Sequence, residues 1–341
     1  MSCYRPLKGF ILGIKDNGKQ DLKLSSYETD HIEISSSGQI YERPNNLGTP
    51  LGRPIREFVT IPCGRCIGCR LQYAKQWADR AVLELPYHDS NLFITLTYDD
   101  DHLPYSESED GLEHWNLRKK DLQDFWKRLR NYCEPEKIKY LACGEYGDTT
   151  FRPHYHSIVF GLKLPDLKYH SRNYDGDLLY TSETLANIWK NGFVLVGEAN
   201  HQTINYVARY VTKKMYGFEA EKYKKFNIEP PFLTMSRNPG LGRLYYEDHK
   251  VELFNESRYS FPTKNGFGSA TPGRYFNNLF ELDFDSKSVI DRKSKLKKQF
   301  EDSTEIELSK TSLNYLEYLA DKEYTKNENT KIFQREFKNS L

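Results

Sequence analysis

Between residues 93 and 214, segments with the two-residue period of a β-strand alternate with segments that have the spacing of an amphipathic helix. Residues 93–98 are apolar or β-branched on both faces, which is typical of a buried central strand. The expected order is a strand at 93–98, a helix around 122–132, strands at 137–143 and 154–160, a short helix ending at 191–192, a strand at 193–196 and a helix at about 203–214. This order predicts an α+β fold in which helices flank a central antiparallel sheet.

The regions on either side of this core are less regular. Residues 1–60 are rich in Gly, Pro, Ser and Asn, and we expect hairpins and irregular loops that pack on the core. An amphipathic helix is expected at 65–85, because its apolar residues form one stripe. Beyond Met215 the periodicity fades. We expect a turn at 144–150, a loop at 230–242, and helices around 287–300 and 304–323.

Composition excludes several classes of protein. The chain has 341 residues, with 49 Lys and Arg against 48 Asp and Glu, so it is not a uniformly basic DNA-coating protein. Any nucleic-acid site must therefore come from local clusters of charge. No run of 18 apolar residues is present and the N-terminus does not have the pattern of a signal peptide, so we expect a cytoplasmic protein without a membrane partner.

Two histidines enter an apolar segment at Arg152-Pro-His154-Tyr-His156. Because side chains alternate along a strand, His154 and His156 point to the same face, where two imidazoles can share one metal ion. A single histidine on a strand is more often an ordinary core or surface group, and that interpretation stays open for each of them. Two histidines at this spacing make a metal site a credible alternative.

Glu145 ends the preceding predicted strand. If the two strands pair, its carboxylate lies beside the histidines and completes an N,N,O set that suits Mg²⁺ or Mn²⁺. By itself, Glu145 is better explained as an exposed carboxylate in a turn.

The helix at 203–214 carries two tyrosines and a lysine on one edge. At about 100° per residue, Tyr206, Tyr210 and Lys213 lie within about 60° of one another, away from the apolar stripe. The edge is either a solvated surface or a row that faces phosphate, in which a tyrosine hydroxyl attacks and a lysine stabilises charge.

A phosphate-binding loop is not indicated. Gly13 to Lys19 approaches the pattern, but Gln20 replaces the Ser or Thr that would hold magnesium. A hairpin turn at Asp16-Asn-Gly-Lys19 explains the segment better, so no ATP-driven motor is expected.

Together these segments resemble the HUH endonuclease superfamily, in which a His-x-His pair precedes a tyrosine helix. The similarity is closest to rolling-circle replication initiators of microviruses, and within these to the gokushovirus type. It rests on the following segments: Thr95-Leu-Thr-Tyr98, Gly144-Glu-Tyr-Gly147, Arg152-Pro-His-Tyr-His156, Tyr206-Val-Ala-Arg-Tyr-Val-Thr-Lys-Lys214, Cys3-Tyr-Arg-Pro6 and Pro62-Cys-Gly-Arg-Cys-Ile-Gly-Cys-Arg70. The resemblance is close over residues 60–216, loose at the N-terminus and poor over the last hundred residues.

The resemblance implies a mechanism. His154 and His156, with Glu145 as third ligand, would hold a metal that polarises the scissile phosphate. Tyr206 or Tyr210 would attack, giving a 5′-phosphotyrosine link and a free 3′-hydroxyl, and the other tyrosine would perform the second transfer. Lys213 would be the assisting cation. Bond energy is retained at each step, so no ATP is needed.

The resemblance also implies an organisation and partners. Residues 61–216 would be the HUH endonuclease domain, after an N-terminal segment at 1–60. Residues 217–341 would be an accessory DNA-binding or packing extension. The partners would be origin DNA, host helicase and host DNA polymerase, in the cytoplasm of the host cell.

Cys63, Cys66 and Cys69 form two consecutive Cys-x-x-Cys steps, a spacing compatible with Zn²⁺, and Cys3 could supply a fourth thiolate. Alternatively, Cys66 and Cys69 simply pack at the start of a helix. Cys133 and Cys143 are expected to be ordinary buried thiols.

Three segments are candidates for DNA contact, although basic helix faces are more often only solvated. They are the series Arg65, Arg70, Lys75 and Arg80, the face from Lys119 to Arg130, and the loop from Ser236 to Gly240.

Other functions fit the sequence less well. Single-tyrosine plasmid initiators and transposases do not match the two-tyrosine helix, and relaxases with the tyrosine first have the opposite order. A different class is a non-catalytic, zinc-dependent module that binds single-stranded nucleic acid by stacking on tyrosines. Covalent attachment to DNA distinguishes an enzyme from such a module.

Overall fold

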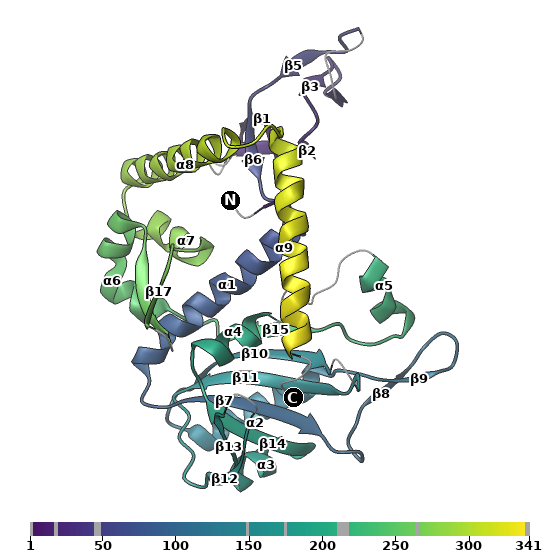
Figure 1. The fold of residues 1–341 in the computed structure, drawn as a ribbon, viewed down its shortest axis with the longest axis vertical. Helices are drawn as coiled ribbons and strands as arrows, with labels where there is room; N and C mark the ends of the chain where they lie inside the picture. The colour runs from purple at the N-terminus through teal and green to yellow at the C-terminus, as the bar shows by residue number, and fades with distance from the viewer. Residues whose placement is uncertain are drawn as a thin grey trace. The chain divides into compact units, whose positions relative to one another are not determined.

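A computed structural model of the chain describes residues 3–16, 20–43, 49–147, 150–173, 176–209, 218–263 and 266–337. Contacts divide the chain into two compact units (Figure 1), one made of residues 1–70 and 295–330 and the other of residues 71–294 and 331–341. Residues 295–330 thus share a unit with residues 1–70, so the units differ from the three ranges expected from the sequence. That residues 61–216 form an endonuclease domain stays a prediction.

The first unit contains two small antiparallel sheets and helical residues from the C-terminal part. One sheet has the order β2-β1-β6 and the other β4-β3-β5. The strands are β1 (Leu7–Ile14), β2 (Gln20–Ser26), β3 (His31–Ile34), β4 (Ile40–Arg43), β5 (Arg53–Ile55) and β6 (Phe58–Ile61), and the helices are α8 (Ser286–Leu308), which begins in the second unit, and α9 (Tyr315–Phe337). Ile14 pairs with Gln20 across β1 and β2, which confirms the hairpin expected there in place of a phosphate-binding loop.

The second unit is built on a seven-stranded antiparallel sheet with the order β12-β13-β14-β7-β11-β10-β15 (Figure 1). Its strands are β7 (Asn91–Tyr98), β10 (Lys139–Tyr146), β11 (Pro153–Phe160), β12 (Lys168–Arg172), β13 (Leu178–Thr181), β14 (Gly192–Glu198) and β15 (Phe232–Met235). The α+β fold predicted from the sequence is confirmed.

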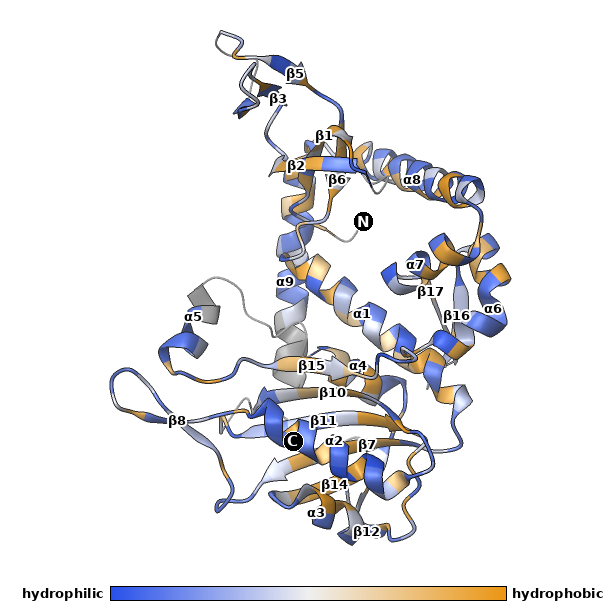
Figure 2. Ribbon diagram, turned by 180° about the vertical axis from the view of Figure 1, so that it is seen from behind, coloured by the Kyte–Doolittle hydropathy of each residue, from blue (hydrophilic) through white to orange (hydrophobic). Residues whose placement is uncertain are grey.

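Helices cover the two faces of this sheet because alternate residues of each strand are apolar on opposite sides. On one face, Tyr155 and Val159 of β11 pack with apolar residues of α2 (Lys119–Cys133) and α3 (Glu183–Trp189). On the other, Ile158 and Phe160 pack with α1 (Ile67–Glu84), α4 (His201–Arg209), α6 (Arg243–Glu256) and α7 (Arg274–Asp283). Figure 2 shows hydrophobic and hydrophilic residues side by side along α1 and α2, as expected for helices that bury one face.

The remaining elements connect these layers. They are a short 3₁₀ helix (Leu85–Tyr87), the hairpin of β8 (Tyr105–Glu107) and β9 (Glu113–Trp115), helix α5 (Phe218–Lys225) and the hairpin of β16 (Tyr259–Thr263) and β17 (Gly266–Ala270). Among the described residues, no helix is both long and apolar enough to cross a membrane.

Three sequence-based expectations need correction. The turn placed at 144–150 begins too early, because β10 continues to Tyr146. The loop at 230–242 contains β15, which pairs with β10. The two C-terminal helices run over 286–308 and 315–337 rather than 287–300 and 304–323. The helix expected at 203–214 begins at His201 and is described to Arg209.

Candidate metal centre and tyrosine

Strand pairing brings together the three predicted metal ligands. Glu145 of β10 lies directly opposite His154 of β11, and His156 follows on the same face. The condition set by the sequence, that the two strands pair, is therefore met.

The three side chains converge on one point. His154 Nε2 lies 3.0 Å and His156 Nε2 3.2 Å from the same oxygen, Oε1 of Glu145. The candidate ligand atoms all lie within 4.8 Å of one another. Glu145 is only 2% exposed, so its interpretation as an exposed turn carboxylate is wrong. Two imidazole nitrogens and a carboxylate oxygen at this spacing make a donor set for one divalent ion.

Second contacts orient the two imidazole rings. His154 Nδ1 lies 3.0 Å from the carbonyl oxygen of Arg152, which can only accept, so Nδ1 donates its hydrogen and Nε2 faces the carboxylate. His156 Nδ1 lies 3.0 Å from the hydroxyl of Thr95 on the neighbouring strand β7. Such contacts to the far nitrogen fix the ring orientation of metal-binding histidines.

The carboxylate of Glu145 is held in its charged form. Burial alone would raise its pKa, but hydrogen bonds from His154 and His156 outweigh burial and lower the pKa from 4.5 to about 2. The site therefore keeps an anionic ligand throughout the physiological pH range.

Helix α4 places Tyr206 beside this group. Ile204, Val207 and Ala208 are fully buried against the sheet, and their phase turns Tyr206 toward β11. The Tyr206 hydroxyl lies 3.3 Å from His156 Nε2. The ring of Phe93 stacks on His156, with centroids 5.6 Å apart, and meets the ring of Tyr206 edge-on at 6.2 Å. Tyr210 and Lys213 lie outside the described residues.

One residue beside the group was not singled out in the sequence. Phe193 of β14 pairs with Thr97 of β7, which pairs in turn with His154, so the three share one row on one face. Phe193 is 67% exposed, and two strand spacings place its Cα about 10 Å from that of His154. An exposed aromatic ring on a sheet face is the usual platform for stacking a nucleobase. The alternation of Phe193 with apolar residues expected on the other face was the only sequence signal.

The other candidate cluster is the set of four cysteines in the first unit. The sulfur atoms of Cys3, Cys63, Cys66 and Cys69 lie within 4.8 Å of one another. Hydrogen bonding with Cys3 lowers the pKa of the Cys66 thiol to about 4. Cys133 does not belong to this cluster.

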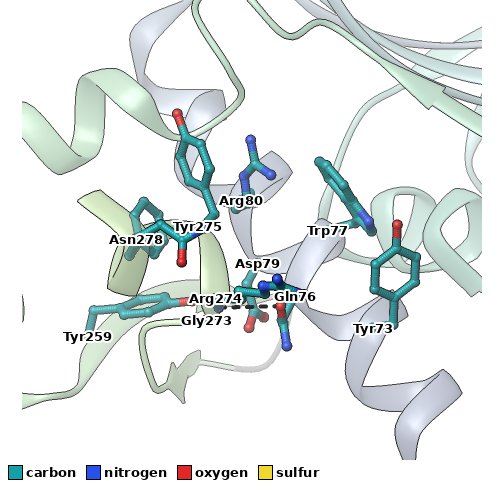
Figure 3. A pocket seen from close by; sticks show the side chains of 11 residues that line it. Tyr73, Gln76, Trp77, Asp79, Arg80, Tyr259, Gly273, Arg274, Tyr275 and Asn278 are labelled. Atoms are coloured by element: carbon teal, nitrogen blue, oxygen red, sulfur yellow. Dashed lines mark hydrogen bonds between the residues drawn. The ribbon is translucent and has the colours of Figure 1, made fainter. Parts of the chain in front are cut away.

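Several basic residues have structural roles that their helical positions do not show. The Arg80 guanidinium lies over the rings of Trp77 and Tyr275, 4.4 and 3.7 Å from their centroids (Figure 3), and donates from Nε to the carbonyl of Leu241. Burial lowers the pKa of Arg80 to about 10. The expected solvated, DNA-facing position of Arg80 is therefore wrong.

Arg128 and Lys75 are likewise engaged within the second unit. Arg128 donates to the carbonyls of Ile188 and Trp189 at 2.7 and 3.1 Å, which ties α2 to α3. Lys75 pairs with Asp79 at 2.7 Å. In the loop from Ser236 to Gly240, the Ser236 hydroxyl accepts from the Tyr140 amide at 3.0 Å.

Fold and site together define an α+β protein with a candidate metal centre beside a helix-borne tyrosine. The family model for replication-associated proteins of the ORF2 type matches residues 91–215. The chain is 34% identical to the replication-associated protein ORF2 of Spiroplasma virus 4 over 286 residues, which cover 82% of this chain and 86% of that protein. It is 32% identical to the replication-associated protein VP4 of Bdellovibrio phage phiMH2K, over 70% of this chain and 73% of the relative. The chain belongs to the family of microvirus replication-associated proteins. No solved structure matches it.

Proposed function

We propose that this protein initiates rolling-circle replication of a small phage genome by nicking the origin strand with a tyrosine. The observation that carries the proposal is the Tyr206 hydroxyl, 3.3 Å from His156 within reach of the Glu145, His154 and His156 group. A nucleophile adjoining a metal-binding group is what phosphodiester cleavage with covalent capture requires.

The donor set favours Mg²⁺ or Mn²⁺, since one anionic oxygen and two imidazoles leave positions for phosphate and water. Bound there, the ion would polarise the scissile phosphate and stabilise its developing charge. Glu145 supplies the negative charge that holds a cation in a buried place. Thr95 and the Arg152 carbonyl hold the two imidazole rings in orientation.

In the proposed step, the Tyr206 oxygen forms a bond to phosphorus and the bond from phosphorus to the 3′-oxygen breaks. The phenol loses a proton and the 3′-oxygen gains one, so protons balance and one phosphodiester replaces another. The products are a 5′-phosphotyrosine link and a 3′-hydroxyl that a polymerase can extend. Tyr210, four residues further along, is proposed for the second transfer that releases and circularises the strand, with Lys213 as the assisting cation.

The proposed partners follow from this chemistry. The protein would bind origin DNA, as a single strand or within the double-stranded replicative form, in the cytoplasm of the host. The free 3′-hydroxyl requires a host DNA polymerase, and strand displacement requires a host helicase. No membrane partner is proposed.

The competing proposal is a non-catalytic zinc-dependent module that binds single-stranded nucleic acid. Such a module needs stacking rings and charge, but no buried carboxylate between two histidines beside a tyrosine. The site geometry therefore favours the enzyme.

The test incubates full-length protein with labelled single-stranded origin DNA and Mn²⁺ and looks for an adduct that survives denaturant. We expect the adduct to need metal, and to be lost when Glu145→Gln removes the anionic ligand. Tyr206→Phe and Tyr210→Phe, alone and together, assign the nucleophiles. Tyr132→Phe, at an exposed tyrosine of α2, is the matched control and should form the adduct normally. Tight binding by the wild type without any adduct would favour the non-catalytic module.

A further inference from the structure

Four thiols from two separated parts of the chain meet in the first unit. Cys3 comes from the N-terminus, and Cys63, Cys66 and Cys69 surround the start of α1. The Cys63 and Cys69 sulfurs are 4.0 Å apart, and those of Cys3 and Cys66 are 3.9 Å apart. Sequence spacing could relate three of these residues but not place the fourth, which is 60 residues from Cys63.

We propose that Cys3, Cys63, Cys66 and Cys69 bind one structural zinc ion. Zinc binds thiolates at about 2.3 Å in a tetrahedron, which puts neighbouring sulfurs about 3.8 Å apart. The two sulfur–sulfur separations are close to that edge length. A disulfide would need about 2.05 Å, and all six cysteines are unbridged. Binding exchanges four thiol protons for one Zn²⁺, so the four-thiolate complex carries two negative charges.

Backbone amides around the cluster are arranged to stabilise anionic sulfur. The amide of Tyr4 donates to Cys66 Sγ at 3.3 Å, and that of Cys63 donates to Cys3 Sγ at 3.2 Å. The amides of Arg65 and Cys66 both donate to Cys63 Sγ, at 3.4 and 3.3 Å. A neutral thiol is a weak acceptor, whereas a thiolate accepts such hydrogen bonds strongly.

The loop between the first two ligands has the conformation that this wrapping requires. Gly64 has a φ of +74°, in the left-handed region that favours glycine, and open space surrounds the place where a Cβ would stand. The chain can therefore turn sharply and point successive amides at the sulfur of Cys63.

The chemistry distinguishes zinc from other metals. Four sulfur ligands select zinc or iron, and a closed set of four protein ligands marks a structural site rather than a catalytic one. A cubane cluster would hold several iron atoms between the thiolates and spread them further than the 4.8 Å found here. The site thus differs from the Glu145 group in both ligands and role, and it does not depend on the proposed nicking activity.

Zinc at this position would fasten the N-terminus within the first unit. Arg5, two residues after Cys3, donates from Nε to Glu323 of α9 at 2.7 Å. The same ion ties Cys3 to the residues that precede α1. Both large apolar clusters of the described residues lie in the second unit. Removing the ion should therefore loosen the first unit before it affects the seven-stranded sheet.

The experiment measures metal content in full-length protein carrying a C-terminal tag, since Cys3 is close to the N-terminus. After purification without added chelator, elemental analysis should find one zinc per chain. Cys3→Ser and Cys66→Ser should lose the zinc, and Cys133→Ser, at a cysteine outside the cluster, should retain it.

A second measurement keeps the test decisive if the variants do not fold. Wild-type protein, stripped of metal and titrated with Co²⁺, should take up one equivalent with the intense absorption of tetrahedral thiolate coordination, and Zn²⁺ should abolish that absorption. Wild-type protein without zinc and without this spectrum would overturn the proposal, as would iron in stoichiometric amount or disulfides among the four cysteines by mass spectrometry.

Discussion

Replacing Glu145 with glutamine isolates what the carboxylate's charge contributes to the metal-free fold. The pKa of Glu145 falls from 4.5 to about 2, because hydrogen bonds from two histidines outweigh the opposing effect of burial. At about 1.4 kcal/mol per pKa unit, this corresponds to roughly 3 kcal/mol of stability at neutral pH. An amide retains part of the hydrogen bonding, so about 3 kcal/mol is an upper value for Glu145→Gln.

The sign of the pH dependence follows from the depressed pKa. The stabilisation is fully present above the unfolded-state pKa, near 4.5, and is lost as the pH falls toward 2. The difference in unfolding free energy between wild type and variant should therefore shrink to about half by pH ~3.

Tryptophan fluorescence is a suitable assay, because the chain's four tryptophans, at 77, 115, 126 and 189, all lie in the second unit. Denaturant titrations in chelator at neutral pH and at about pH 3 give the two differences. Equal stability of wild type and Glu145→Gln at neutral pH, or a difference that stays constant as the pH falls, would refute the account of this site.

Four further changes test other contacts. Tyr206→Phe should remove the adduct that Tyr206 forms while leaving binding of Mn²⁺, measured calorimetrically, unchanged; weaker metal binding would mean that the phenol is a ligand. Thr95→Val removes the hydroxyl beside His156 Nδ1 and should weaken metal binding about 10- to 100-fold, and unaltered affinity would contradict the orienting role. Phe193→Ala should weaken single-stranded DNA binding by about 1–3 kcal/mol in fluorescence anisotropy, with Phe193→Tyr as the control that keeps the ring; equal affinity for all three proteins would exclude stacking there. Arg80→Met should lower the thermal stability of the second unit without altering the salt dependence of DNA binding, and the opposite pattern would return Arg80 to the DNA contacts.

The ligand strands were predictable because their patterns are local. Alternation along residues 154–160 gives the common face of the histidines, and strand pairing then requires only one register. The extent of β10 was not predictable from the same signals, because Gly144 is typical of a turn. In the structure Gly144 stands in the strand, where a Cβ would come within 2.7 Å of the Phe232 ring, so close packing explains the glycine.

Features that depend on distant segments were missed for a common reason. β15 lies between prolines and has the composition of a loop, but pairing with β10 makes it an edge strand. Arg80 falls on a basic helix face, and only the approach of Tyr275 from α7 buries it. Likewise, periodicity does not contain the information that residues 295–330 join the N-terminal unit.

The most direct test of the central claim is to identify the residue that carries DNA. Trypsin separates the two tyrosines, since residues 191–209 contain Tyr206 and residues 210–213 contain Tyr210. After reaction with Mn²⁺ and origin DNA, nuclease trimming and tandem mass spectrometry, we expect a nucleotide linked to Tyr206 in the peptide 191–209. A nucleotide only on the peptide 210–213 would contradict the assignment of Tyr206, and covalent DNA on neither peptide would contradict the tyrosine mechanism as a whole.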